Sequence, residues 1–297
     1  MAGFIEVQNE IASKMAVLLE DIFEDDLKDD PAVKAGLYSL EAGGKRLRPA
    51  IMYSSARMLG VEEEEIRPFA VALEIIHTYS LIHDDLPALD NDDLRRGKPT
   101  CHKAFGESIA ILAGDMLLNR AFEILMRDVL ISPSHSYAAL KMAGFSGIRG
   151  MVGGQSMDMS SQGKKLDKDE LKLLQYKKTG ALIKAAFMTP YYIMHGDGYD
   201  NVGELLSSFS DHVGSAFQIK DDILDVESDK ETLGKSVGKD EAEDKSTFVT
   251  ACGLEGAKEE LRAELSSARE DLKTLKELGF DTEIFESLTD YLEKREN

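Results

Sequence analysis

The sequence of 297 residues lacks tryptophan, contains only two cysteines and has far fewer basic than acidic side chains. Cys101 and Cys252 are isolated and have no CxxC spacing, so neither a zinc site nor a disulfide framework is indicated, and a reduced cytoplasmic setting fits. The 35 basic residues against 55 acidic ones leave a formal net charge of −20, which argues against nucleic-acid binding because a polyanion needs a basic surface. No apolar run approaches the roughly 20 residues of a membrane-spanning helix, and the first residues carry no signal pattern. We therefore expect a soluble protein.

Apolar residues recur at helical spacing along most of the chain, and no segment alternates with period two or contains an Asn-Gly hairpin turn. Long helices are predicted over residues 68–79, 108–130, 168–194, 205–226 and, as an amphipathic tail, 254–294. Glycines predict breaks at 43–44, 97–99, 153–154, 196–198 and 234–238. No Pro/Ser-rich linker divides the chain. The predicted fold class is all-α, a helical bundle in a single domain that covers residues 1–297.

Two short apolar stretches each contain three aspartates. The first cluster is Asp84, Asp85 and Asp90, and the second cluster is Asp221, Asp222 and Asp225. Like charges this close repel unless a cation lies between them, and Mg²⁺ held by few carboxylates usually also holds a phosphate. The two clusters are therefore predicted to form two walls of one cavity that binds a polyphosphate.

The two clusters differ in local geometry. Spacings of i,i+4 and i,i+3 in the second cluster predict one helix face shared by its three carboxylates and Gln218. A solvated acidic stripe is the alternative, although flanking residues such as Phe217 make this helix too apolar to lie loosely on the surface. In the first cluster Pro87 cannot continue a helix without losing a hydrogen bond. The helix is predicted to distort or end there, and the following turn to bring Asp90 back toward Asp84.

Basic side chains follow the first cluster and a pair of glycines. Arg95 and Arg96 suit the oxygens of a diphosphate, with simple pairing to the neighbouring aspartates as the alternative. The segment of Gly44, Lys45 and Arg48 lets backbone and cations approach an anion together, although a solvated loop is the usual case.

Three further candidate sites have weaker support. His77 lies seven residues before Asp84 and hence on the same predicted helix face, but a lone histidine on an apolar helix is usually a core residue. Lys178 and Thr179 interrupt a helical run and are candidates for facing a cavity. Lys235, in a glycine-flanked loop, could close over a phosphate, although a surface lysine is the more frequent case.

In order and spacing, these segments resemble the trans-isoprenyl diphosphate synthases, and within that family the bacterial farnesyl type. The motifs are GGKRLRP from residue 43, YSLIHDDLPALD from 79, DDLRRGKPTCH from 92, GGQ from 153, KKTG from 177 and FQIKDDILD from 217. Together they extend over nearly the whole chain. The resemblance implies the isoprenoid synthase fold, an all-α bundle around a central active-site cavity, usually assembled as a homodimer.

The resemblance also implies a prenyltransferase that condenses isopentenyl diphosphate with dimethylallyl and geranyl diphosphate by ionisation, condensation and elimination. Three Mg²⁺ ions would clamp the allylic diphosphate between Asp84, Asp90 and Asp221, with Asp85, Asp222 and Asp225 as further acids. The residues implied to hold the allylic diphosphate are Arg95, Lys178 and Lys235, and those implied for isopentenyl diphosphate are Gly44, Lys45, Arg48, His77 and Arg96. Thr179 and Gln218 would stabilise the allylic cation with their dipoles.

Product length is expected to depend on the cavity floor. Tyr79 lies five residues before Asp84, over one helical turn deeper, and with Ser80 it would stop the growing chain at the fifteen-carbon farnesyl product. The alternatives are a geranylgeranyl diphosphate synthase, a noncatalytic subunit and a terpene cyclase. A noncatalytic subunit typically loses aspartates, and a cyclase has no need of basic residues for a second diphosphate. The family often ends in a basic stretch that closes over the isopentenyl site, whereas residues 294–297 are only partly basic.

Overall fold

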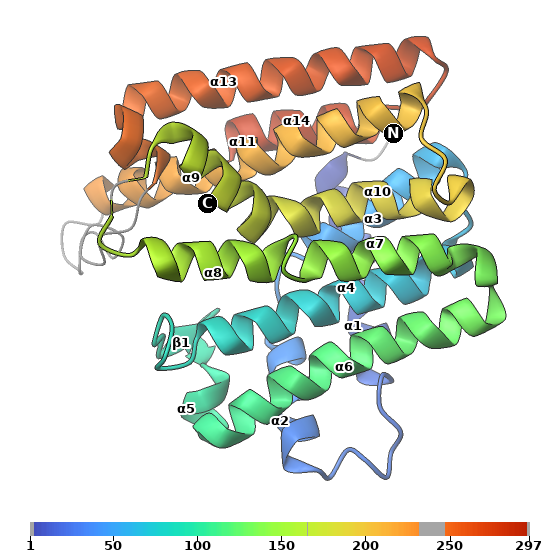
Figure 1. The fold of residues 1–297 in the computed structure, drawn as a ribbon, viewed down its shortest axis with the longest axis vertical. Coiled ribbons are helices and arrows are strands. Elements are labelled where there is room, and N and C mark those ends of the chain that lie inside the picture. Colours follow the sequence, from blue (N-terminus) through green and yellow to red (C-terminus); the bar gives the residue numbers. More distant parts are fainter. Residues whose placement is uncertain (1–2, 165, 232–246, 296–297) are drawn as a thin grey trace.

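The computed structural model describes residues 3–164, 166–231 and 247–295, and it confirms the predicted all-α fold (Figure 1). Its helices are α1 (Phe4–Glu20), α2 (Pro31–Glu41), α3 (Leu47–Leu59), α4 (Glu63–Asp84), α5 (Cys101–Phe105), α6 (Glu107–Ile131), η1 (Pro133–His135), α7 (Ser136–Ser146), α8 (Met151–Ser161), α9 (Lys168–Gln175), η2 (Tyr176–Gly180), α10 (Ala181–His195), α11 (Asn201–Glu231), α13 (Phe248–Glu277) and α14 (Glu283–Lys294). Two short strands, β1 (Leu94–Arg95) and β2 (Lys98–Pro99), pair in the described part of the chain. None of the helices in these ranges is both long and apolar enough to cross a membrane.

The helices pack side by side around a shared hydrophobic core, with α4 in the middle (Figure 1). α4 packs against α6 on one side and against α3 and α10 on the other, whereas α11 and α13 pack along each other at the edge of the bundle. Every residue of α4 from Phe69 to Ile76 is buried, and all of them except Glu74, which pairs with Arg46, are apolar, as expected for a helix surrounded by its neighbours. Its carboxyl end carries the first aspartate cluster.

α4 ends at Asp84, three residues before Pro87, where the sequence predicts a break. The chain then turns back, and the backbone N–H of Asp90 donates to the carbonyl oxygen of Asp84 at 2.9 Å. Asn91 follows in a left-handed conformation (φ 50°), which asparagine tolerates better than most residues. The predicted return of Asp90 toward Asp84 is confirmed.

The helix predicted over residues 168–194 is interrupted by the π-helical turn η2, which separates α9 from α10. A π-helical turn shifts side chains out of the α-helical register and is frequent at functional sites. Lys178 and Thr179 both lie in η2, so the interruption predicted at these residues is confirmed.

The predicted absence of hairpins is wrong at one place. Residues 97–99 were expected to form only a break, but they belong to a small antiparallel hairpin with Leu94 opposite Pro99. Its tight turn uses Arg96 (φ 55°) and Gly97 (φ 76°) in left-handed conformations. Such a turn needs positive φ values but no Asn-Gly pair, so the sequence signal was missing.

The predicted break at Gly153 and Gly154 is also wrong, because both residues lie inside α8. A Cβ atom on Gly154 would lie 2.2 Å from the backbone nitrogen of Lys178. Glycine is therefore needed for a close approach of α8 to η2 and not for a turn. Of the other predicted breaks, 43–44 and 196–198 separate helices, and 234–238 lies outside the described residues.

Candidate active site

A cavity of about 490 Å³ lies between α4, α8, η2 and α10. The predicted site residues on its wall are Arg48, His77, Tyr79, Ser80, Asp84, Lys178 and Thr179. Its other lining residues, most of them apolar, are Leu81, His83, Leu89, Met151, Val152, Gln155, Ser156, Met159 and Leu182. The cavity thus combines a few charged groups with an apolar surface, which suits a ligand that has a charged head and a hydrocarbon tail.

Asp84 places a carboxyl group on the cavity wall in a poorly solvated position. Burial raises the pKa of Asp84 to about 6 against the opposing charge of Lys178, and the charge of Asp90 adds to the rise. Since burial and a neighbouring carboxylate both disfavour the charged form, this position would gain from a divalent cation.

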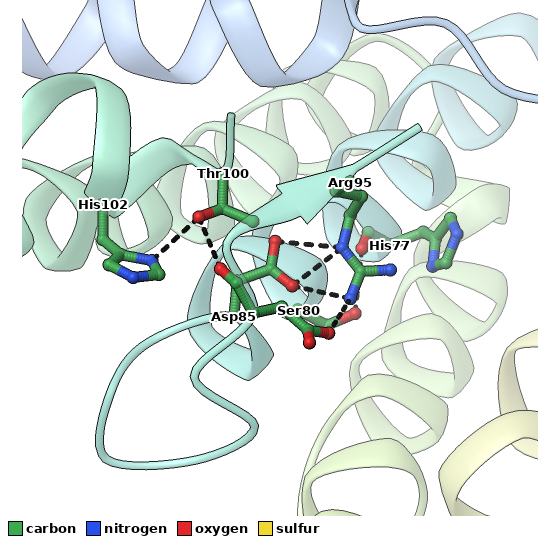
Figure 2. A network of polar contacts seen from close by, with 7 residues as sticks. His77, Ser80, Asp85, Arg95, Thr100 and His102 are labelled. Carbon is green, nitrogen blue, oxygen red and sulfur yellow. Dashed lines mark hydrogen bonds and ion pairs between the residues drawn. The ribbon is translucent and has the colours of Figure 1, made fainter. Parts of the chain in front are cut away.

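Asp85 is directed to Arg95 and does not line the cavity (Figure 2). Only 2% of Asp85 is exposed, and Arg95 donates to its carboxylate from Nε at 2.8 Å and from Nη2 at 2.6 Å. Asp92 lies 3.6 Å from the same Nη2. The pairing with neighbouring aspartates, which the sequence left open as an alternative for Arg95, therefore exists. It fixes the guanidinium group of Arg95, which lies between Asp85 and His77 in Figure 2. The role of Asp85 in metal binding stays a prediction.

Residues predicted for a second diphosphate lie close together. Arg96 donates to the carbonyl oxygen of Gly43, and its Cζ atom is 2.6 Å from where a Cβ atom of Gly44 would lie. Burial lowers the pKa of His77 well below its usual range, and the charges of Arg48 and Arg96 lower it further. The imidazole is therefore neutral near pH 7 and lies in a positive field, which favours an anionic ligand.

In the second aspartate cluster, Asp222 lies beside Gln218 as the i,i+4 spacing predicts, but its carboxylate is engaged by other protein groups. This residue is 6% exposed and accepts hydrogen bonds from Nε2 of Gln218 at 3.0 Å and from the backbone N–H of Phe248 at 2.8 Å. Adjacent residues on an α-helix point about 100° apart, so Asp221 and Asp222 are directed to different neighbours. Asp222 joins α11 to the first turn of α13.

Asp221 is directed toward basic residues. Its Oδ1 lies 2.7 Å from Nη1 of Arg295, a C-terminal residue whose guanidinium also lies 5.0 Å from the centre of the Phe217 ring. Burial lowers the pKa of Lys45, with a further decrease from the charge of Arg295 and an increase from that of Asp221. These three charges therefore lie near one another, whereas Asp225 is exposed farther along α11. Arg295, a described residue of the partly basic C-terminal segment, thus reaches the second cluster.

Lys178 and Thr179 connect the cavity wall to two neighbouring helices. Nζ of Lys178 lies 2.5 Å from Oδ2 of Asp158 on α8. Thr179 donates from Oγ1 to Oε1 of Gln218 on α11 at 3.0 Å. The π-helical turn is therefore held on both sides by polar contacts that fix the orientation of its side chains.

Sequence reasoning missed Asp158, and it gave no role to Gln155, which belongs to the GGQ motif and lies one turn earlier in α8 on the cavity wall. A usable signal was the glycine pair at Gly153 and Gly154, since glycines inside a helix mark close contact with another element. Because the pair was interpreted as a break, the residues that follow it were not assigned to a helix face that borders the cavity.

The model of the polyprenyl synthetase family matches residues 31–279. The chain belongs to this family. Farnesyl diphosphate synthase of Escherichia coli (strain K12) is 44% identical over 272 residues, which cover 90% of each chain. Geranylgeranyl pyrophosphate synthase 7 of Arabidopsis thaliana is 43% identical over 88% of this chain and 75% of its own length. The structure of a geranyltransferase from Helicobacter pylori, complexed with magnesium and isoprenyl diphosphate, has a TM-score of 0.79 at 29% identity, over 98% and 96% of the two chains.

Polyprenyl synthetases depend on magnesium. In the described part of this polyprenyl synthetase, no group of three or more His, Cys, Asp or Glu side chains is placed to hold a metal ion alone. Magnesium takes one or two protein carboxylates together with substrate phosphates and water, and Asp84 offers one such carboxylate on the cavity wall. The raised pKa of Asp84 identifies a carboxyl group that such an ion would stabilise. Lys235, the remaining predicted residue, lies outside the described residues.

Proposed function

We propose that this polyprenyl synthetase condenses isopentenyl diphosphate with dimethylallyl and then geranyl diphosphate to give farnesyl diphosphate. The observation that carries the proposal is a single cavity whose wall holds Asp84 and Lys178, the neighbouring basic residues Arg48 and His77, and an aromatic residue, Tyr79. Similarity to farnesyl diphosphate synthases over most of the chain supports the same product.

In the first step the allylic C1–O bond breaks, and its electron pair leaves with the diphosphate. Asp84, Asp90 and Asp221 would hold three magnesium ions, which supply charge neutralisation that makes the diphosphate a better leaving group. Lys178, oriented by Asp158, would hold the same diphosphate as its charge grows. The apolar cavity excludes water from the allylic cation.

In the second step the double bond of isopentenyl diphosphate attacks C1 of the allylic cation and forms the new carbon–carbon bond. A proton then leaves from C2 of the isopentenyl unit, and the released diphosphate is a sufficient base. Arg48, Arg96 and neutral His77 would hold the isopentenyl diphosphate, with Gly44 leaving room for the Arg96 guanidinium. The two diphosphates are thereby kept on separate sets of residues.

Tyr79 is proposed to end chain growth. Only 5% of this residue is exposed, and its ring packs edge-to-face on His83 at 5.9 Å, which supports its position in the cavity. A geranylgeranyl product is the alternative, because a relative with that activity is similarly identical to the chain. Whether Tyr79 closes the cavity to a longer chain therefore decides between the two products.

A homodimer is also proposed. α6 carries several exposed apolar side chains, among them Leu130 (83% exposed) and Ile131 (84%), and a second copy of the chain would cover them. Light scattering after size-exclusion chromatography tests this assembly, and a monomer at micromolar concentration would contradict it.

The proposed reaction is tested by incubating the protein with Mg²⁺, isopentenyl diphosphate and dimethylallyl diphosphate, and by measuring the length of the products. A fifteen-carbon product is expected. Asp84→Asn should lower the rate by about a hundredfold or more, since one charge-stabilising group is removed. Asp93→Asn, which alters an exposed pair with Lys103, is the matched control. No prenyl product longer than five carbons from the wild type would overturn the proposal.

A further inference from the structure

Gln155 is a polar residue on the cavity wall that has no partner in the described protein. Both polar atoms of its side chain, Oε1 and Nε2, are buried and make no hydrogen bond. Burying an amide without hydrogen bonds is unfavourable, so native proteins rarely keep such a group unless a ligand or a reaction uses it.

Gln218 provides the contrast. Its Oε1 accepts from Thr179 at 3.0 Å, and its Nε2 donates to Asp222 at 3.0 Å, so both ends of this amide are already engaged within the protein. Gln155, by comparison, keeps both lone pairs of its carbonyl oxygen available. Gln175, directly before η2, also has an Oε1 without a partner among the described residues, but its Nε2 donates to Asp222 at 3.2 Å and it does not line this cavity. Gln155 is therefore the glutamine on the cavity wall whose dipole is free to respond to charge there.

The position of Gln155 along the cavity is set by α8. Gln155 precedes Asp158 by three residues, or about 4.5 Å at 1.5 Å per residue, and Asp158 pairs with Lys178. α4 and α8 run in the same direction, with their carboxyl ends toward the β1 side of the molecule (Figure 1). Tyr79 precedes Asp84 in α4 by five residues, or about 7.5 Å. Gln155 therefore lies between the level of the diphosphate and the floor of the cavity.

The contact between α8 and η2 keeps Gln155 at this level. Gly154 lets the α8 backbone approach Lys178 to a distance at which a Cβ atom would collide with Lys178 N, Lys178 Cα and Lys177 C at 2.2, 2.6 and 2.7 Å. These are backbone atoms, which cannot move aside as a flexible side chain can. The glycine thereby holds the next residue, Gln155, beside the turn that carries Lys178 and Thr179.

We propose that Gln155 is a catalytic residue whose side-chain carbonyl oxygen contacts the allylic carbons and stabilises the positive charge that forms on them. This inference rests on the proposed prenyl transfer. The amide forms no covalent bond and exchanges no proton: its dipole faces the carbon skeleton as the C1–O bond breaks. Because the dipole is held in place in an apolar cavity, it stabilises charge without reorganising, which favours the ionised state over the bound substrate.

The test compares Gln155→Leu, which keeps most of the side-chain volume and removes the dipole, with Gln162→Leu. Gln162 lies seven residues later, just after α8, and its side chain is exposed, so it is a matched control. For Gln155→Leu we expect kcat to fall about ten- to hundredfold with KM for dimethylallyl diphosphate changed less than threefold. Its melting temperature should stay equal or rise, because a buried amide without partners has been removed.

A second measurement uses two ligands of the same shape in the presence of Mg²⁺. One is 2-(dimethylammonio)ethyl diphosphate, which carries a positive charge where the allylic cation carries it, and the other is 3-methylbutyl diphosphate, its uncharged carbon counterpart. Calorimetry should show that Gln155→Leu weakens binding of the ammonium compound about tenfold and leaves the affinity for the carbon compound within twofold. The Gln162→Leu variant should bind both as the wild type does.

Several results would overturn the role of Gln155. An unchanged kcat would do so, as would equal losses of affinity for the two ligands. A lower melting temperature together with a lower kcat would indicate a structural role instead. Failure of the proposed function is distinguishable, because in that case the wild type itself would form no prenyl product.

Discussion

Gly154→Ala perturbs the contact between α8 and η2 by one methyl group. The new Cβ atom would lie 2.2 Å from the backbone nitrogen of Lys178, well inside van der Waals contact. Because the backbone of η2 cannot rotate away, α8 and η2 must separate by about 1 Å to relieve the overlap. Lys178 and Gln155, which both line the cavity, would then shift relative to each other.

The magnitude combines two opposing effects. Replacing glycine by alanine inside a helix stabilises it by about 1 kcal/mol, whereas overpacking typically costs about 1–3 kcal/mol. Contact with backbone atoms places Gly154 at the upper end of that range, so we expect a net destabilisation of about 1–2 kcal/mol. Displacing a reacting group by about 1 Å can cost about a hundredfold in rate, so kcat should fall by roughly that factor.

Gly144→Ala is the matched control. Gly144 lies inside α7, and nothing is found within 4 Å of a Cβ atom built on it. This variant should gain about 0.5–1 kcal/mol in the free energy of unfolding and keep wild-type turnover. Urea unfolding followed by circular dichroism and a prenyl-transfer assay measure both variants. Equal stability and equal turnover of Gly154→Ala and Gly144→Ala would refute the close-approach argument.

Three further predictions concern other parts of the protein. Tyr79→Ala should lengthen the main product beyond fifteen carbons, as seen by chromatography, and an unchanged product would place the floor elsewhere. Asp158→Asn should raise KM for the allylic diphosphate about tenfold through loss of its pair with Lys178, with little change in melting temperature; an unchanged KM would show that the lysine orients itself. Arg46→Met leaves Glu74, 2% exposed, without its ion-pair partner and should destabilise the protein by about 3–5 kcal/mol in urea unfolding. The double variant Arg46→Met with Glu74→Leu should recover most of that loss, and equal instability of the two variants would contradict the explanation.

The end of α4 shows where local sequence reasoning succeeds. Pro87 lacks a backbone donor, so the chain must leave the helix near Asp84, and the turn that follows is short enough for sequence to constrain it. The interruption at Lys178 and Thr179 was likewise readable from local pattern. In contrast, the Gly153 and Gly154 pair was ambiguous, because a glycine that permits a turn and a glycine that permits close packing look the same in one sequence.

The aspartate clusters show the same limit at the level of side chains. Spacing alone assigned all three residues of the second cluster to one face, but the identity of the neighbouring helix decides which carboxylate turns inward. Asp222 accepts a hydrogen bond from the first turn of α13, and Asp85 forms an ion pair with Arg95. Neither contact follows from periodicity, since both depend on residues brought near by the fold.

The sequence by itself determined the helical class and the family, and it named the charged residues that line the cavity (Arg48, Asp84 and Lys178), because each of these follows from composition, periodicity or short motifs. Only the tertiary structure decided which aspartates face the cavity and which bind other protein groups. Asp84 lies on the cavity wall, whereas Asp85 binds Arg95 and Asp222 binds the first turn of α13. The structure also showed that Gln155 has no hydrogen-bond partner among the described residues and that Asp158 pairs with Lys178. The physical reason is that hydrogen bonding and burial are properties of pairs of residues far apart in the chain, and no local pattern records which pairs will meet.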